Sequence, residues 1–175
     1  MSSHENTGTS ALATTAGRLR AALAPKTLAE ALIAGGGGFI TIFLLSWLND
    51  RLVVLLLIAP FGASCVLGFA LPQSPLAQPR NVIGGHAIAT IAGLLVQMSL
   101  GATPLGFALG VALAIAGMIL TRTVHPPAGA DPIVVLLASA SWSFLATPVL
   151  IGTSTIMLAG IVYHRIASGK AYPTT

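Results

Sequence analysis

Six apolar runs, separated by short polar segments, occupy the chain from residue 28 onward and constrain its fold more than any other feature. In chain order they are Leu28–Leu48, Leu52–Leu71, Val82–Leu100, Pro104–Thr121, Pro132–Ala146 and Pro148–Tyr163. Runs of about 20 apolar residues match the roughly 30 Å hydrocarbon core of a bilayer. The last two runs are short for that thickness, so we expect thin spans or a half-helix there. Strict alternation of apolar and polar residues is absent, which favours helices over barrel strands.

The composition excludes a water-soluble domain. Only 7% of the 175 residues are charged, whereas soluble domains carry about 25%. Disorder is excluded as well, because it requires low hydrophobicity and high charge. We therefore predict an all-α, polytopic membrane bundle in contact with the lipid bilayer. The single cysteine, Cys65, lies in an apolar run. No disulfide framework, metal site or cofactor is expected.

The basic residues predict the orientation in the membrane. Seven of the eight fall on one side of a six-span arrangement, and Arg51 alone falls on the other. The seven are Arg18, Arg20, Lys26, Arg80, Arg122, Arg165 and Lys170. Cytoplasmic segments are rich in Lys and Arg, so we expect both termini in the cytoplasm. This scattering argues against nucleic acid as a partner. Together with the apolar runs, these charges predict a cytoplasmic tail (1–27), a transmembrane domain (28–164) and a second cytoplasmic tail (165–175).

Small residues recur at three- or four-residue spacing on three of the runs. The sets are Ala31, Gly35 and Gly38; Gly85, Ala89 and Gly93; and Gly106, Gly110 and Ala114. Such faces let helix backbones approach closely, either within one bundle or between protomers. We expect a homo-oligomer that uses them.

A short internal repeat relates the second run to the start of the fifth. Residues 60–67 (PFGASCVL) and 127–134 (PAGADPIV) both contain Pro-x-Gly-Ala followed by aliphatic residues. Each copy belongs to a unit of three runs, and an odd number of spans inverts the second unit. Transporters show this arrangement, with sites where broken helices meet. The alternative is a chance match in a chain rich in Ala and Gly.

Two groups of polar residues interrupt the apolar pattern. His86, Thr90, Gly93 and Gln97 share one face of the third run, where they either join helices or line a pathway. The stretch from Arg122 to Pro132 contains His125-Pro126-Pro127, which should be extended, and Asp131-Pro132, typical of a helix start. Here His125 could bind an anion, relay a proton or form a salt bridge. An ordinary cytoplasmic loop is the alternative.

The segment His125-Pro126-Pro127-Ala128-Gly129-Ala130 resembles the signature of the HPP family of small integral membrane proteins. A second block, from Gly62-Ala63-Ser64 through residues 74–86 (SPLAQPRNVIGGH), is also similar to that family. The resemblance implies four membrane helices and, by analogy with plastid and cyanobacterial relatives, movement of nitrite. Asp131-Pro132 departs from the small residues expected there. A carboxylate beside an anion path needs neutralisation by Arg122 or by a proton.

The favoured hypothesis is a channel or transporter for a small inorganic anion, nitrite first, in a bacterial inner membrane. Helix starts at residues 62–64 and 128–130 would stabilise the anion, the histidines would supply proton-linked donors, and Arg80 and Arg122 would attract it. The predicted pathway comprises Gly62, Ser64, Arg80, Asn81, His86, Arg122, His125, Pro126, Pro127, Gly129 and Asp131. A structural or regulatory subunit that docks a partner through glycine faces is the alternative. An enzyme is not expected, because no nucleophile–base pair is visible at helical spacing.

Overall fold

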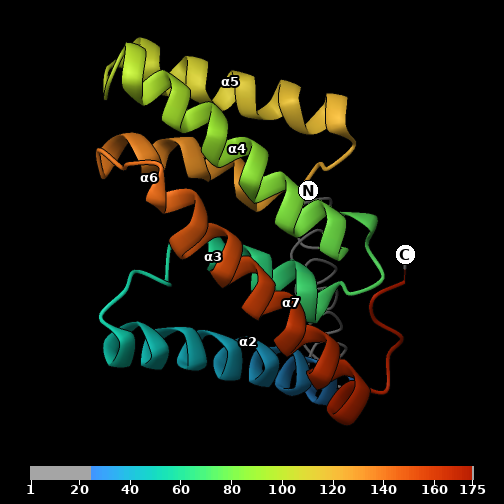
Figure 1. Ribbon diagram of the computed structural model, residues 1–175. Coiled ribbons are helices and arrows are strands. Elements are labelled where there is room, and N and C mark those ends of the chain that lie inside the picture. The colour runs from blue at the N-terminus through green and yellow to red at the C-terminus, as the bar shows by residue number, and fades with distance from the viewer. Residues whose placement is uncertain (1–24, 175) are drawn as a thin grey trace, which may run out of the picture.

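Four long apolar helices and two short ones form the chain in the computed structural model, which describes residues 25–174 (Figure 1). The long helices are α2 (Pro25–Leu52), α4 (Pro79–Ser99), α5 (Pro104–Thr121) and a last helix, Leu145–Ser168, made of η4 (Leu145–Leu150), α7 (Ile151–Tyr163) and η5 (His164–Ser168). Each is long and apolar enough to cross a membrane. The short helices are Pro60–Ala70, made of α3 (Pro60–Cys65) and η1 (Val66–Ala70), and Pro126–Leu137, made of η3 (Pro126–Ala130) and α6 (Asp131–Leu137). A single turn, η2 (Pro75–Ala77), precedes α4.

The second and fifth apolar runs are therefore not full-length helices. The helix of the second run begins only at Pro60, after non-helical residues 53–59. Proline suits the first turn of a helix, since its missing N–H would have no partner there. The helix of the fifth run ends at Leu137. Six runs and four long helices are thus compatible, because two runs form short helices.

The helix of the sixth run extends beyond the apolar run at both ends. We expected a short segment over Pro148–Tyr163, but the helix covers 24 residues, Leu145–Ser168, with non-helical backbone at Thr147. It continues through His164, Arg165 and Ser168 because backbone hydrogen bonding, not side-chain polarity, sets where a helix ends.

The chain consists of two units with the same order of long, short and long helix. In Figure 1, α3 and α6 run in opposite directions. Near the far end of the first short helix, Gln73 donates to the carbonyl of Ala171. Ala138, which follows the last residue of the second short helix, lines a surface pocket together with Val54 and Leu55. These two residues follow α2, at the opposite end of the bundle from Ala171. This arrangement agrees with the hypothesis of two inverted units.

One end of the bundle gathers most of the described basic residues. Arg80, at the start of α4, donates to the carbonyl of Thr121 at the end of α5. Arg122 directly follows α5. Arg165 lies in the last turns of the last helix, and Lys170 follows that helix. Arg51, in contrast, lies at the opposite end of the bundle, where α2 ends. The charge pattern used to predict orientation is therefore present. Arg18 and Arg20 lie outside the described residues.

Two of the three small-residue faces pack inside the chain. A Cβ added to Gly93 would lie 2.8 Å from Cα of Pro132, and one added to Gly110 would lie 3.0 Å from Cβ of Pro132. Thus α4 and α5 use their glycines to approach α6 closely. These two faces are filled within one chain, so an oligomer would need another surface.

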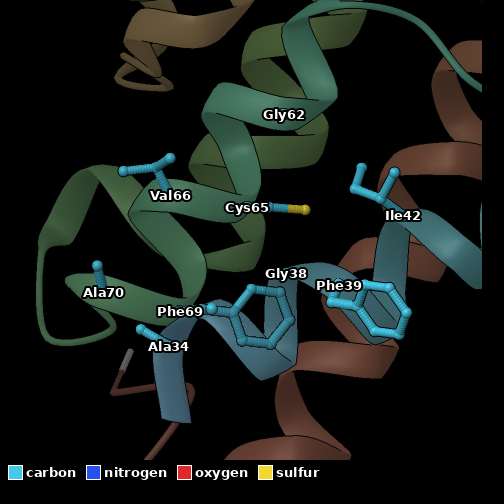
Figure 2. A pocket seen from close by; sticks show the side chains of 10 residues that line it. Ala34, Gly38, Phe39, Ile42, Gly62, Cys65, Val66, Phe69 and Ala70 are labelled. Atoms are coloured by element: carbon cyan, nitrogen blue, oxygen red, sulfur yellow. The ribbon is translucent and has the colours of Figure 1, made fainter. Parts of the chain in front are cut away.

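Gly35 and Gly38 of α2 behave differently. A Cβ on Gly35 or Gly38 would meet nothing within 4 Å. Both glycines line an apolar groove of about 400 Å³ between α2 and the helix α3–η1. Figure 2 shows Phe69 directed into this groove and the sulfur of Cys65 pointing toward α2. Within the described residues, α2 is also the least buried of the four long helices.

Candidate functional site

Four polar side chains meet where the two short helices begin. Ser64 comes from α3, His86 from α4, His125 from the residue before η3, and Asp131 from the start of α6. All four are 0% exposed. We call this group the junction centre.

The side chains of the junction centre form one continuous chain of hydrogen bonds. Asp131 Oδ2 lies 2.7 Å from His86 Nδ1, and His86 Nε2 lies 2.8 Å from Ser64 Oγ. Ser64 Oγ also lies 2.8 Å from His125 Nε2. His125 Nδ1 donates to the carbonyl of Leu76 over 2.8 Å. This series of hydrogen bonds therefore connects the two units of the protein, with His86 on α4 in its middle.

Local sequence explains how these side chains reach one another. His125 has extended backbone (φ −139°, ψ 102°), as expected for a residue before proline. On α4, Gly85 lets the His125 segment lie against the helix. A Cβ at Gly85 would be 2.8 Å from both the His125 Cβ and the Thr123 carbonyl oxygen.

The polar face predicted for the third run is largely confirmed. His86 and Thr90 are fully buried, and both side chains bond Asp131 Oδ2, Thr90 as a donor over 3.4 Å. Gly93 contacts Pro132 one turn further on. Gln97 is half-buried, and its Oε1 has no hydrogen-bond partner in the described part of the chain.

The start of α4 secures the loop that carries His125. Arg80 donates to the Thr121 carbonyl over 3.1 Å, and Asn81 Nδ2 donates to the Val124 carbonyl over 2.9 Å. Both were predicted to belong to the substrate pathway. Here they hold backbone on each side of Arg122, outside the junction centre.

The position of Asp131 differs from the prediction in two ways. We expected an N-cap, but α6 has no side-chain capping bond and the Asp131 carboxylate points to α4. We also expected either Arg122 or a proton to neutralise it, and the structure does not bring Arg122 to it. Arg122 instead is exposed and ends α5 with φ 56°. Among the described residues, the ion pair of Asp131 is with His86.

Other predicted pathway residues lie beside the junction centre. Gly62 is exposed and lines the groove next to α2. Pro126 is exposed, whereas Pro127 and Gly129 are half-buried. These three residues shape η3 and thereby place His125 and Asp131.

Sequence reasoning missed two parts of the site. The carbonyl of Leu76 is a backbone group, so no residue pattern could reveal it as the acceptor of His125. Phe61 packs edge-on against His86, with ring centroids 5.4 Å apart. One helical turn separates Phe61 from Ser64, which places both on the same side of α3.

One atom of the junction centre has no partner. Asp131 Oδ1 is buried and forms no hydrogen bond with any described residue. A buried carboxylate oxygen without a partner is costly. It therefore marks a position where an additional hydrogen-bond donor would be stabilised.

Comparison with known proteins identifies the family. The model described as "HPP, transmembrane region" matches residues 23–173. The chain belongs to the HPP family. Two proteins of Dictyostelium discoideum, each described as a transmembrane protein, are 36% identical to it. One alignment covers 77% of this chain and 47% of the relative, and the other covers 67% and 44%. The chain thus spans less than half the length of these relatives. No solved structure matches this HPP protein.

The His125-Pro126-Pro127 segment has a defined structural role in this chain. Its prolines start η3 and its histidine enters the junction centre. The order Asp131–His86–Ser64 also matches the hydrogen-bond order of acyl-transfer triads. Here the serine hydroxyl is fully buried and is held by a second histidine. In this arrangement Ser64 bridges the two imidazoles.

Proposed function

We propose that this HPP protein transports a small inorganic anion across the membrane, with nitrite as the first substrate to test. One observation carries the proposal. The starts of two oppositely directed short helices meet at a buried cluster of two histidines, a serine and an aspartate within an apolar bundle.

This observation favours transport because ionisable groups at membrane depth are costly and mark ion or substrate pathways. Irregular backbone inside a membrane is tolerated only where protein or a cavity surrounds it. Secondary transporters place their substrate sites where the discontinuous helices of inverted units meet. The buried ionisable groups, the non-helical backbone at His125 and the meeting of two short helices at the junction centre therefore support the proposal.

Charge balance makes an anion acceptable next to Asp131. The carboxylate faces His86 at 2.7 Å, so a proton shared by the two groups leaves the pair neutral. An anion could then take hydrogen bonds from Ser64 and the imidazoles once the short helices separate. Backbone donors contribute less than predicted, because Gly62 N–H already donates to Ala59 and Ala128 N–H to His125.

The basic end of the bundle would collect the anion before it enters. Arg80 and Arg122 are both exposed there, next to the loop that carries His125. Positive charge at an entrance raises the local anion concentration and the rate of encounter. In this proposal that end, with both termini, faces the cytoplasm of a bacterial cell.

Nitrite uptake into proteoliposomes tests the proposal. Initial rates are compared for the wild type, His125→Ala and His164→Ala, with empty liposomes as the background. His164 is the matched control, because it is a buried histidine outside the junction centre. We expect His125→Ala to lose most uptake and His164→Ala to retain it. Wild-type uptake no faster than the background would refute nitrite, and equal uptake by both variants would refute the role of His125.

A structural subunit is the second candidate, favoured by the open groove at Gly35 and Gly38. A partner helix, or a second copy of the chain, would fill that groove. Purification from the native membrane with a stoichiometric partner, together with no flux by the isolated protein, would support this function over transport.

A further inference from the structure

The junction centre contains more hydrogen-bonded contacts than its neutral side chains have hydrogens. Four contacts link it from end to end: Leu76 O to His125 Nδ1, His125 Nε2 to Ser64 Oγ, Ser64 Oγ to His86 Nε2, and His86 Nδ1 to Asp131 Oδ2. Each is 2.7–2.8 Å long, so each requires one hydrogen between its two atoms.

Three hydrogens come from the neutral groups. A serine hydroxyl has one, and a neutral imidazole has one on either ring nitrogen. The carbonyl of Leu76 and an ionised Asp131 have none. With Ser64 and two neutral histidines, one of the four contacts lacks a hydrogen.

The direction of the chain fixes where the hydrogens lie. Because the Leu76 carbonyl only accepts, His125 Nδ1 carries a hydrogen. If Ser64 donates to His125 Nε2, then His86 Nε2 must donate to Ser64, and a fourth hydrogen lies between His86 Nδ1 and Asp131. If Ser64 donates to His86 instead, His125 carries two hydrogens. The total is four in both cases.

The alternative acceptor for Ser64 does not lower this total. Its hydroxyl also lies 3.3 Å from the Pro60 carbonyl. Donation there would require an N–H from both imidazoles at Ser64, which raises the number of hydrogens. Thr90 brings its own hydrogen to Asp131. The extra hydrogen is therefore a property of the junction centre itself.

No other titratable side chain faces the junction centre among the described residues. On α4, Arg80 bonds the Thr121 carbonyl outside it. Residues 104–121 of α5 contain no titratable group. On α3, Cys65 faces the groove, and on α7, Tyr163 donates to the Ile33 carbonyl. The fourth hydrogen thus neutralises Asp131.

We propose that the junction centre binds one exchangeable proton, which closes the contact between the two short helices, and that the anion moves together with this proton. The second part rests on the proposed function. When the proton leaves for water, Asp131 keeps its negative charge and one contact loses its hydrogen. The junction then loosens, and the next proton enters with the next anion.

Asp131→Asn is the matched variant for this proposal. The amide of asparagine can donate to His86 Nδ1 from its own N–H. His86 Nε2 then donates to Ser64, and Ser64 to His125, so all four contacts are filled without an exchangeable proton. We therefore expect Asp131→Asn to fold like the wild type but to be insensitive to the proton gradient.

Spectroscopy detects the proton without transport. Solid-state NMR of nitrogen-15 histidine in the full chain in liposomes, with infrared detection of a protonated carboxyl, locates the four hydrogens near neutral pH. We expect His125 with Nδ1–H, and the fourth hydrogen on His86, His125 or Asp131. In Asp131→Asn we expect two neutral imidazoles. An ionised Asp131 beside two neutral imidazoles in the wild type would overturn the bound proton.

A flux assay tests the coupling. With an inward proton gradient, wild-type liposomes should accumulate nitrite about tenfold for each pH unit, at an initial rate well above that of empty liposomes. Asp131→Asn should lose this acceleration. Equal acceleration in both proteins would overturn the coupling. If nitrite moves no faster than in empty liposomes, the proposed function fails, and the spectroscopy alone then supports or overturns the bound proton.

Discussion

Residues 25–174, which the structure describes, contain two buried histidine clusters, and they differ in how their hydrogen bonds are completed. One is the junction centre. The other surrounds His164, near the end of the last helix. His164 is 1% exposed. Its Nε2 donates to the Gly68 carbonyl over 2.8 Å, and its Nδ1 accepts from Ser168 Oγ over 2.6 Å.

The cluster at His164 is complete with a neutral imidazole. Two contacts need two hydrogens, and His164 and Ser168 supply one each. The rings of Phe69, Tyr163 and Tyr172 pack around it, with centroids 5.1–6.2 Å from that of His164. No carboxylate among residues 25–174 bonds this imidazole. The junction centre needs one more hydrogen than its neutral groups provide.

Burial of a histidine is therefore a poor guide to proton chemistry. The histidines of both clusters are almost completely buried, and each of them bonds a serine hydroxyl. The distinguishing feature is the number of contacts relative to the number of hydrogens. By this criterion the His164 cluster is structural, since it joins the last helix to η1.

Removal of each histidine should separate the two clusters most strongly. His86→Leu leaves the Asp131 carboxylate buried without a counter-charge, so we expect a loss of about 3–5 kcal/mol in folding stability. His164→Leu leaves one carbonyl without a donor and should cost about 1–3 kcal/mol. Thermal unfolding of both variants in the same detergent measures the difference.

A double variant controls for lost packing. In His86→Leu combined with Asp131→Leu, no unpaired charge remains, so much of the lost stability should return. Equal losses for the two single variants, or no recovery in the double variant, would contradict the distinction between the clusters.

A smaller effect is expected at two glycines, Gly85 beside the junction centre and Gly38 in the groove next to α2. Gly85→Ala places a Cβ 2.8 Å from the Thr123 carbonyl oxygen and from the His125 Cβ, so it should destabilise by about 1–3 kcal/mol. Gly38→Ala meets no atom within 4 Å, and it should stabilise α2 by up to about 1 kcal/mol because alanine favours helix. Opposite shifts in unfolding temperature are expected. A destabilising Gly38→Ala would show that the groove is not open in the membrane.

Much of the fold was predictable from the sequence because the bilayer imposes a simple length rule. The runs that became α2, α4 and α5 begin and end within a few residues of their predictions. The half-helix at Asp131 was also foreseen as one alternative. The length of the last helix was not, since Arg165 and Ser168 end the apolar run but not the backbone hydrogen bonds.

The junction centre was only partly predictable. The repeat aligns Ser64 with Asp131, and the helical face of α4 contains His86. The sequence could not show that Asp131 turns to His86 and away from Arg122, because that choice depends on how the short helix crosses α4. The acceptor at Leu76 is a backbone carbonyl, which no side-chain pattern reveals.

The smallest effect concerns the tyrosine that connects the two clusters. Tyr172 packs on His164, and its hydroxyl donates to the carbonyl of Ala77, next to the Leu76 carbonyl that holds His125. Tyr172→Phe removes this bond and should cost about 1 kcal/mol at neutral pH. Burial raises the pKa of Tyr172 from 10.0 to about 12. The folded protein thus retains a proton that the unfolded chain releases above pH 10, so this contribution is complete below pH 10 and disappears as the pH rises toward 12. Unfolding temperatures measured across this range should decline more steeply for the wild type than for Tyr172→Phe. Parallel declines would mean that the phenol does not titrate with folding, and that the link between the clusters depends on ring packing alone.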